Sequence, residues 1–299
     1  MLIFFKLFHI KSVYCINNKL NFKHFNMKKR IKWVLCLILL LLLFVPQNIH
    51  SQVDTTGHLQ ILTGYYNDLY SQPYSRNFNV FYGGFGYKSP NTSIFGKVNY
   101  GMTSKILDGE YLEPKSYGLQ YELDYYQRLT KSTTSWWNYA YSNSTIFPDH
   151  RFMMRVWQKL PAAFLVSGGM SYYNFYGNHT HFLNFGLEKY VGKYWFEYKI
   201  FVPLYQPNVA TSHFLSARRF FKDINYLQLT VGYGPSDDDP WDADNYKLLN
   251  AYRAGILYVT NVGDRFRIRA GVNYMYENYN ENDWRNRYSL AVGLTFNIN

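Results

Sequence analysis

The last stretch of the sequence, residues 286–298, constrains the fold more than any other. Every second residue in it is apolar and the residues between are polar or small; the apolar set is Tyr288, Leu290, Val292, Leu294, Phe296 and Ile298. An uninterrupted period of two predicts a β-strand with one apolar and one polar face. The apolar face needs either the core of a β-sandwich or a lipid bilayer against it. This strand alone leaves both alternatives open.

The same stretch carries Gly293, Phe296 and Ile298 in the order glycine, two residues, apolar, one residue, apolar. This pattern resembles the C-terminal signal that outer-membrane β-barrels present to the machinery that inserts them. It departs from that signal at Ala291, where a polar residue is usual, and at Asn299, which follows the final apolar residue. The resemblance implies that Gly293, Phe296 and Ile298 act as an insertion signal.

The first 51 residues have the composition of a leader. A basic cluster at residues 27–30 precedes an apolar run at 33–45, which Pro46 ends, and a polar stretch follows as far as Ser51. This is the organisation of a secretory signal peptide, and the run is shorter than the roughly 20 residues of a transmembrane helix. We therefore predict a mis-assigned upstream start at 1–26, a signal peptide at 27–51 and one barrel domain at 52–299.

Loss of that leader changes the charge of the chain. The whole sequence has a net charge of +11, but residues 1–51 hold eight of its 31 Lys and Arg residues and no acid, which leaves 23 basic and 20 acidic residues and a net charge of +3. We therefore expect no nucleic-acid partner. Cys15 and Cys36 also lie in the leader, so the exported chain has no disulfide and no thiolate chemistry.

The exported part of the chain is rich in aromatic residues and contains no second long apolar stretch. Of the 31 tyrosines, only Tyr14 lies in the leader, and tyrosine is enriched where proteins cross membrane interfaces. An exported chain that spans a membrane without apolar helices must form a closed barrel. We predict an all-β, antiparallel transmembrane β-barrel of about fourteen strands, or twelve if two weak segments are misread.

The lengths of the expected connections support this prediction. Those after even-numbered strands are short, for example 89–91, 130–132, 191–193 and 261–264. Those after odd-numbered strands are mostly longer, for example 67–76, 103–115, 235–246 and 277–285. Short periplasmic turns that alternate with longer external loops are typical of an outer-membrane barrel with both termini in the periplasm. We therefore predict the outer membrane of a Gram-negative bacterium as the location.

The middle of the chain resembles the YaiO-type outer-membrane β-barrel family over residues 91–239. The matching segments include Phe95-Gly96-Lys97-Val98-Asn99-Tyr100, Glu122-Leu123-Asp124-Tyr125-Tyr126, Tyr190-Val191-Gly192-Lys193-Tyr194, Arg218-Arg219-Phe220-Phe221 and Gly232-Tyr233-Gly234. Their order and spacing carry the resemblance. It implies a fold and a location rather than a mechanism. Some members are similar to proteins encoded near polysaccharide-handling enzymes, which hints at an envelope polysaccharide as partner.

Charged residues are expected to line the lumen, because only the outer face meets lipid. Glu122 and Asp124 share one face of a strand about 7 Å apart, a pair that can serve acid–base or glycoside chemistry. The alternative is that the inward arginines pair with inward carboxylates and brace the barrel; the set is Arg151, Arg155, Arg265, Arg267 and Arg269 with Glu122, Asp124, Glu188 and Glu197.

Arg265, Arg267 and Arg269 also form a row of their own. Rows of cationic side chains favour anionic solutes in pores, so this row is a candidate anion pathway. The alternative is that lumen carboxylates neutralise it.

An acidic loop offers weak candidates for a cation site: Asp237, Asp238, Asp239, Asp242 and Asp244. Hard cations take such oxygen ligands, but the loop lacks the glycine and the final Glu of an EF-hand, so a solvated acidic loop is the plainer interpretation. The exported histidines are His58, His150, His179, His181 and His213, and only His213 and Ser216 approach a nucleophile–base spacing. We assign no catalytic residue, metal or cofactor.

These observations favour a non-enzymatic outer-membrane barrel with a polar, charged lumen. It would serve as a pore, or as an export or anchoring component for an envelope glycan. The alternative is an outer-membrane enzyme that modifies lipid A or hydrolyses lipid or glycan at the external rim. The expected partners are outer-membrane lipid and lipopolysaccharide, the barrel insertion machinery, and an anionic solute or envelope polysaccharide.

Overall fold

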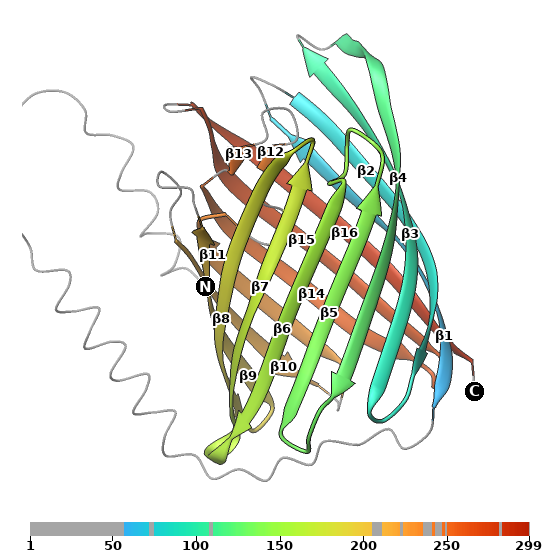
Figure 1. The fold of residues 1–299 in the computed structure, drawn as a ribbon, viewed down its shortest axis with the longest axis vertical. Coiled ribbons are helices and arrows are strands. Elements are labelled where there is room, and N and C mark those ends of the chain that lie inside the picture. Colours follow the sequence, from blue (N-terminus) through green and yellow to red (C-terminus); the bar gives the residue numbers. More distant parts are fainter. Residues whose placement is uncertain are drawn as a thin grey trace, which may run out of the picture. The chain divides into compact units, whose positions relative to one another are not determined.

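A computed structural model describes residues 57–71, 75–107, 110–204, 211–221, 224–235, 241–242, 247–248, 250–280 and 283–298. The predicted leader and signal peptide lie outside these residues. Fourteen antiparallel strands close into a barrel (Figure 1). Each strand pairs with the next along the chain, and the last pairs with the first through a register that sets Leu59 opposite Ile298. The prediction of fourteen strands is confirmed.

The barrel strands are β1 (His58–Tyr70), β2 (Ser75–Lys88), β3 (Thr92–Leu107), β4 (Glu110–Arg128), β5 (Thr133–Ser142), β6 (His150–Leu160), β7 (Phe164–Phe175), β8 (Asn178–Val191), β9 (Tyr194–Leu204), β10 (Ser212–Phe220), β11 (Tyr226–Tyr233), β14 (Ala251–Val262), β15 (Phe266–Asn280) and β16 (Asp283–Ile298). A two-stranded sheet of β12 (Trp241–Asp242) and β13 (Lys247–Leu248) lies in the connection between β11 and β14. A 3-10 turn, η1 (Pro161–Ala163), joins β6 to β7.

The alternation in the sequence places successive side chains of each strand on the outer and the inner face of the barrel. On β16, Val292 and Leu290 are exposed on the outer face, 44% and 43%, whereas Ser289 and Arg287 on the inner face are only 5% and 3% exposed. Apolar side chains project outward in this way around the barrel, because that face meets lipid rather than water. The face assignment made for the last strand is confirmed. Among the described residues, no helix is long and apolar enough to cross a membrane.

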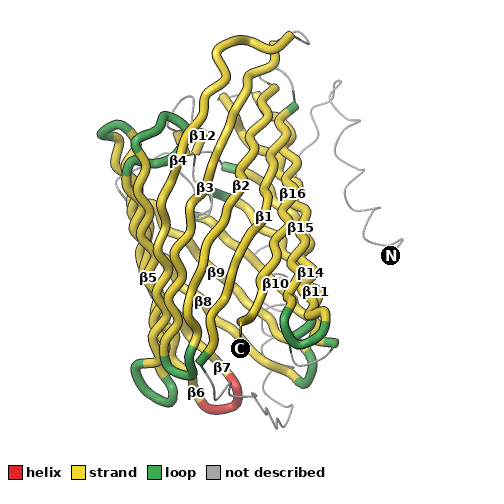
Figure 2. The backbone as a smooth tube through the Cα atoms, turned by 90° about the vertical axis from the view of Figure 1, so that its right-hand side faces the viewer, coloured by secondary structure: helices red, strands yellow, loops and turns green. Residues whose placement is uncertain are grey.

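The two ends of the barrel differ in their connections. β1 begins and β16 ends at one end, which we call the terminal rim, and the turns after β2, β4, β6, β8, β10 and β14 lie at that same end (Figure 2). The opposite end, the loop rim, carries the hairpin connections after β1, β3, β5, β7, β9, β11 and β15.

Several segments that the sequence suggested as loops are strands instead. Residues 103–115 are mostly the far ends of β3 and β4, where Lys105 pairs with Leu112, and this hairpin rises above the rest of the loop rim (Figure 2). Residues 277–285 likewise extend β15 and β16, with Glu277 opposite Arg285. The extra length therefore forms long hairpins, because the backbone groups there still find partners across the ladder.

The interior is not uniformly polar, which differs from the expected lumen. One buried apolar cluster consists of Met153, Tyr173, Phe182, Phe201 and Phe214. A second consists of Val80, Ile146 and Phe147, with Tyr66 and Phe78 packed against it. Both clusters point inward, so apolar side chains fill part of the barrel between the charged groups.

Candidate functional site: a central cavity

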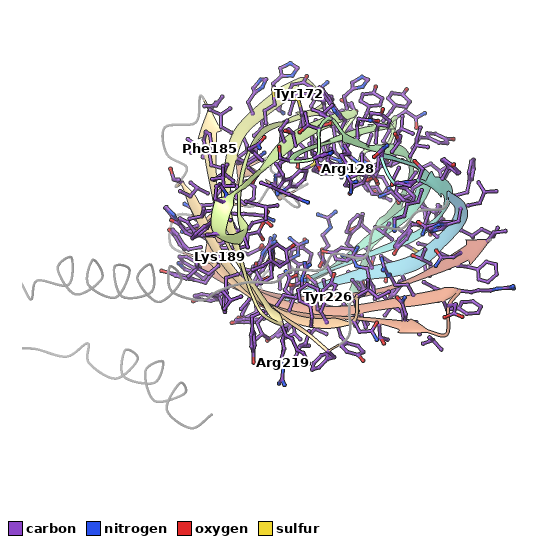
Figure 3. The ribbon with its side chains drawn as sticks, turned by 90° about the horizontal axis from the view of Figure 1, so that it is seen from below. Arg128, Tyr172, Phe185, Lys189, Arg219 and Tyr226 are labelled. Carbon is purple, nitrogen blue, oxygen red and sulfur yellow. The ribbon has the colours of Figure 1, made fainter. Side chains whose placement is uncertain are left out.

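A cavity of about 550 Å³ occupies the interior of the barrel. Every barrel strand except β3 and β8 contributes a residue to its lining, and so does the segment Ile146, Phe147 and Pro148. Figure 3 views the barrel from below, with side chains from opposite walls projecting into the interior.

Positive charge dominates the lining of this cavity. Two carboxylates contribute to it, Asp68 and Glu197. Seven cationic residues do so: Arg76, Arg151, Arg155, Lys199, Arg253, Arg269 and Arg287. The lining therefore carries a clear excess of formal positive charge.

One wall of the lumen holds a network of matched charges, which we call the β3–β6 network. Lys97 Nζ lies 2.8 Å from Glu122 Oε1 and 2.9 Å from Asp124 Oδ2, so one ammonium group joins both carboxylates. Arg151 Nη2 lies 3.0 Å from the same oxygen of Glu122. Asn138 Nδ2 donates to both carboxylates, at 2.8 Å and 2.9 Å.

The remaining acceptor positions of these carboxylates are also occupied. Asn99 Nδ2 donates to Glu122 Oε2 at 3.0 Å, and Trp136 Nε1 donates to Asp124 Oδ1 at 2.9 Å. An acid–base pair needs a carboxyl that can reach a substrate proton, whereas the oxygens of both carboxylates here are occupied by donors from the barrel wall. The geometry of Glu122 and Asp124 fits a brace between strands better than a catalytic pair.

The predicted arginine row does not line the cavity as a unit. Arg265 lies in the turn before β15, exposed at the terminal rim. Arg267 Nε donates to Asn261 Oδ1 at 3.1 Å. Only Arg269 of the three lines the central cavity, and within the described part of the chain it has no carboxylate partner. In the described chain no lumen carboxylate pairs with these three arginines, because Glu122 and Asp124 face Lys97 and Arg151, and Glu188 and Glu197 are bonded within the wall of β6 to β9.

The other predicted lumen charges lie on the wall of β6 to β9. Glu188 accepts hydrogen bonds from Trp157 Nε1 at 2.9 Å and Trp195 Nε1 at 2.8 Å. Its neighbour across the ladder, Glu197, pairs with Lys199 at 3.0 Å. Arg155 Nε donates to Asn184 Oδ1 at 3.1 Å.

The connection from β5 to β6, residues 143–149, folds into the barrel and narrows it. Gly101 and Gly118 face each other across β3 and β4 and leave a recess in the wall. A Cβ at Gly101 would lie 2.6 Å from Phe147 Cζ, and one at Gly118 would lie 2.9 Å from Ile146 Cγ1. The recess therefore receives these two side chains, and we call residues 143–149 the inward loop.

Sequence reasoning missed this loop. Its signal was an apolar triplet, Ile146-Phe147-Pro148, in a connection expected to face water, together with two glycines on neighbouring strands. It also missed two ion pairs, Asp68 with Arg287, and Glu277 with Arg285 at 2.5 Å. Asp68, Glu277 and Arg285 lie in segments that the sequence predicts as loops, so their pairing across strands is not evident from it.

The histidine–serine candidate is not a catalytic pair. His213 is exposed on the outer face of β10, whereas Ser216 faces inward and lies 3.0 Å from Thr230 Oγ1. Residues three apart on a strand face opposite sides, so these two groups cannot meet. His58 lies at the start of β1 beside Gln60, 3.1 Å away.

The acidic-loop candidates fall almost wholly outside the described residues. Asp237, Asp238, Asp239 and Asp244 are among those not described, and Asp242 is described only as part of β12. Within the described ranges, no group of three or more His, Cys, Asp or Glu residues could hold a metal ion.

The residues of the predicted insertion signal have local packing roles. Gly293 lies opposite Gly64, and a Cβ on either glycine would come within 2.4 Å of the Tyr82 side chain. Both glycines therefore make room for that ring, an arrangement known from designed sheets, where an aromatic ring covers a glycine of the neighbouring strand. Phe296 packs on Phe266 with ring centroids 4.9 Å apart, and Ile298 is exposed on the outer face.

Comparison with known proteins places the chain among membrane β-barrels. The YaiO membrane beta barrel domain model matches residues 58–239. Similar solved structures include OccK7 (OpdD) of Pseudomonas aeruginosa, at 10% identity and TM-score 0.43 over 81% of this chain and 99% of that one. The translocator domain of the autotransporter NalP from Neisseria meningitidis matches at 11% identity and TM-score 0.41, over 82% and 90%.

An anion-selective porin from Comamonas acidovorans matches at 10% identity and TM-score 0.37, over 81% of this chain and 99% of that one. No curated protein matches the sequence.

Proposed function

Because the chain belongs to the YaiO membrane β-barrel family, and is thus an outer-membrane barrel, we propose that its cavity passes small anionic solutes in preference to neutral or cationic ones. The observation that carries this proposal is the lining, seven cationic residues against two carboxylates. Positive side chains around a pathway favour anions. A low-dielectric wall strengthens their field within the cavity.

Local pairing does not cancel this field. Arg76 bonds to a neutral group, with Nε 2.7 Å from Thr103 Oγ1, and Arg269 has no carboxylate partner in the described chain. Both guanidinium groups therefore keep their positive charge available to a solute. Arginine suits this role because its planar donors match carboxylate and phosphate groups.

The size and the apolar part of the lining indicate a ring-bearing solute. A volume of about 550 Å³ lies within the range of ordinary ligand sites. Trp136, Tyr173, Phe201 and Phe214 contribute aromatic surface beside the arginines. Aromatic rings offer broad apolar contact, so an acidic monosaccharide, the unit of an anionic envelope glycan, fits both the charge and the volume.

The proposal includes an orientation. The terminal rim faces the periplasm and the loop rim faces the exterior, after removal of residues 1–51 and insertion of the barrel through the signal at Gly293, Phe296 and Ile298. The support is that every connection at the terminal rim has two to five residues, whereas the longer connections, 143–149 and 234–250, lie at the loop rim, as the longer loops of outer-membrane barrels do at the external end.

Uptake into vesicles tests the proposal. Residues 52–299 refolded into neutral phosphatidylcholine vesicles are given glucuronate, glucose or glucosamine at mildly acidic pH, three solutes of similar size that differ in charge. We expect glucuronate to enter fastest and glucosamine slowest, because the cavity attracts anions and repels cations. Equal rates, or faster entry of glucosamine, would contradict the proposal.

A further inference from the structure

Pairs of polar side chains form a belt around the outside of the loop rim. In five of the seven hairpins that close there, an outward tyrosine on the first strand is hydrogen bonded to a side chain on the second strand, one step nearer the rim. The five bonds are Tyr139 Oη to His150 Nδ1 at 3.0 Å, Tyr172 Oη to His179 Nδ1 at 2.9 Å, Tyr198 Oη to His213 Nδ1 at 2.7 Å, Tyr65 Oη to Asn79 Oδ1 at 2.6 Å and Tyr274 Oη to Asn286 Oδ1 at 2.7 Å.

Aromatic pairs occupy the equivalent place on the other two hairpins. Tyr100 and Tyr117 stack with ring centroids 6.4 Å apart, and Tyr233 lies 4.8 Å from Tyr252. Girdles of aromatic residues mark the level where a barrel passes from hydrocarbon to lipid head groups. The belt therefore lies at head-group level.

The belt divides into two arcs. The histidine arc covers the three neighbouring hairpins from β5 to β10 and contains His150, His179, His181 and His213. The asparagine arc covers β15, β16, β1 and β2, which are also neighbours, and contains Asn79 and Asn286. Since asparagine accepts the same tyrosine bond at the same place, that bond does not explain the choice of histidine.

Histidine differs from asparagine in two properties. The tyrosine hydroxyl engages Nδ1, so the other ring nitrogen, Nε2, is left to contact a further group; for His150, His179 and His213 it has no hydrogen bond within the described chain. Histidine is also the side chain that gains a proton between about pH 8 and pH 5. A row of histidines at head-group level therefore becomes a row of cations on acidification.

No permanent cation competes for this role. The outward residues of β5 to β10 near the loop rim include no Lys or Arg in the described chain. By contrast, the turns and strand ends of the terminal rim carry permanent charge at Lys88, Arg128, Lys131, Lys159, Lys193 and Arg219.

We propose that the histidine arc binds phosphate groups of the phosphorylated glycolipid of the outer leaflet, lipid A. The inference rests on the orientation under the proposed function, which places the loop rim outside. Neighbouring histidine positions are two strands apart, about 10 Å, so separate phosphates can be bound along the arc. Protonated imidazole donates charge-assisted hydrogen bonds to phosphate, and the tyrosine oxygen can then accept from Nδ1–H, which keeps each pair intact.

The groups around the histidines are mostly uncharged, so few fixed charges compete with the histidines for a phosphate group. His150 faces Tyr139 and Tyr141 on β5 and Asn174 on β7. His179 and His181 lie beside Tyr172, with Leu204 of β9 on the other side.

His213 faces Tyr198 and Ile200 on β9 and Tyr233 on β11. The one carboxylate beside the arc in the described chain is Asp149, which accepts a hydrogen bond from the backbone N–H of Tyr176 at 2.8 Å.

The test measures how lipid changes the thermal unfolding of refolded residues 52–299 at about pH 5.5 and pH 8, the range over which histidine titrates. The vesicles contain phosphatidylcholine alone, phosphatidylcholine with lipid A, or phosphatidylcholine with phosphatidylglycerol. We expect lipid A to raise the unfolding temperature by about 2–4 °C more at the lower pH. Stabilisation through an imidazolium is present below the pKa of the unbound ring and is lost as the pH rises.

The asparagine arc supplies matched variants. His150→Asn, His179→Asn, His181→Asn and His213→Asn together should abolish the pH-dependent shift while keeping the tyrosine bonds. The reverse change, Asn79→His with Asn286→His, should enlarge the shift, and it keeps the proposal testable if the first variant does not refold.

An equal shift at both pH values, an unchanged shift in the asparagine variant, or an equal shift with phosphatidylglycerol would overturn the proposal. Selective uptake of glucuronate depends on the cavity and not on this outer face, so the two proposals fail separately.

Discussion

Cationic side chains are paired with carboxylates on one wall of the lumen and are left without a carboxylate partner on another. In the β3–β6 network, Lys97 and Arg151 are matched by Glu122 and Asp124 within 3.0 Å. Across the barrel on β15, Arg269 lines the cavity without a carboxylate partner in the described chain. The first arrangement joins strands and adds little net field. The second leaves a positive charge for a solute, so the predicted polar lumen combines a brace with an attractive surface.

The largest expected effect, loss of membrane insertion, comes from a charge on the lipid-facing side of the wall that contains Arg269. Leu294 lies on the outer face of β16, next to Gly293, the inward residue that pairs with Arg269. Leu294→Arg should prevent stable insertion, because an arginine that faces lipid costs up to roughly 2–4 kcal/mol, depending on its depth. Heat-modifiable migration of the refolded variant measures this. Normal migration would show that β16 does not face lipid at this position.

The second largest effect is a loss of stability when a carboxylate of the β3–β6 network is removed. Glu122→Ala should lower the free energy of unfolding by about 3 kcal/mol, because it leaves Lys97 and Arg151 without their shared carboxylate. This value is at the low end for breaking a buried ion pair, because the Lys97 side chain is 22% exposed and can be partly hydrated. Urea unfolding in lipid vesicles measures it. A loss under about 1 kcal/mol would mean that water replaces the carboxylate and that the network is no brace.

A smaller effect concerns the inward loop, which packs against Gly101 of β3 and Gly118 of β4. Gly101→Val should displace Phe147, which lies 2.6 Å from the position of the new Cβ, at a stability cost of about 1 kcal/mol. Glucuronate uptake should fall, because Phe147 leaves its recess in the wall and projects further into the lumen. Gly96→Val on the same strand is the control, because a Cβ there meets nothing within 4 Å. If both variants transport like the wild type, the loop is not the constriction.

The smallest expected effect on stability comes from replacing Arg269, which has no carboxylate partner in the described chain. Arg269→Ala should change the free energy of unfolding by no more than about 0.5 kcal/mol, since no ion pair is broken, yet it should reduce the preference for glucuronate over glucose. Arg267→Ala is the matched control, because Arg267 is bonded to Asn261 and does not line the cavity. Equal preference in the two variants would remove Arg269 from the pathway.

The sequence predicted what depends on one strand at a time. Alternation alone gave the outward face of Leu290 and Val292, the inward face of Glu122 and Asp124, and the number of strands. A period of two is a local property, so it can be read without knowing which strands are neighbours.

Features that depend on register between strands could not be predicted in the same way. Lys97 joins Glu122 because the two lie opposite each other on β3 and β4. The recess for the inward loop needs Gly101 to face Gly118, and register depends on turn geometry that the sequence left open. The charge of the cavity is likewise a sum over residues from most of the strands. Of the three arginines that the sequence singles out, only Arg269 is one of the seven cationic residues of the lining.

The reversal potential of the refolded barrel in a planar bilayer, under a gradient of potassium chloride, tests the central claim most directly. We expect a steady conductance whose reversal potential has the sign set by chloride, because the seven cations of the lining outnumber its two carboxylates. A reversal potential with the sign set by potassium, or a folded barrel without steady conductance, would contradict it.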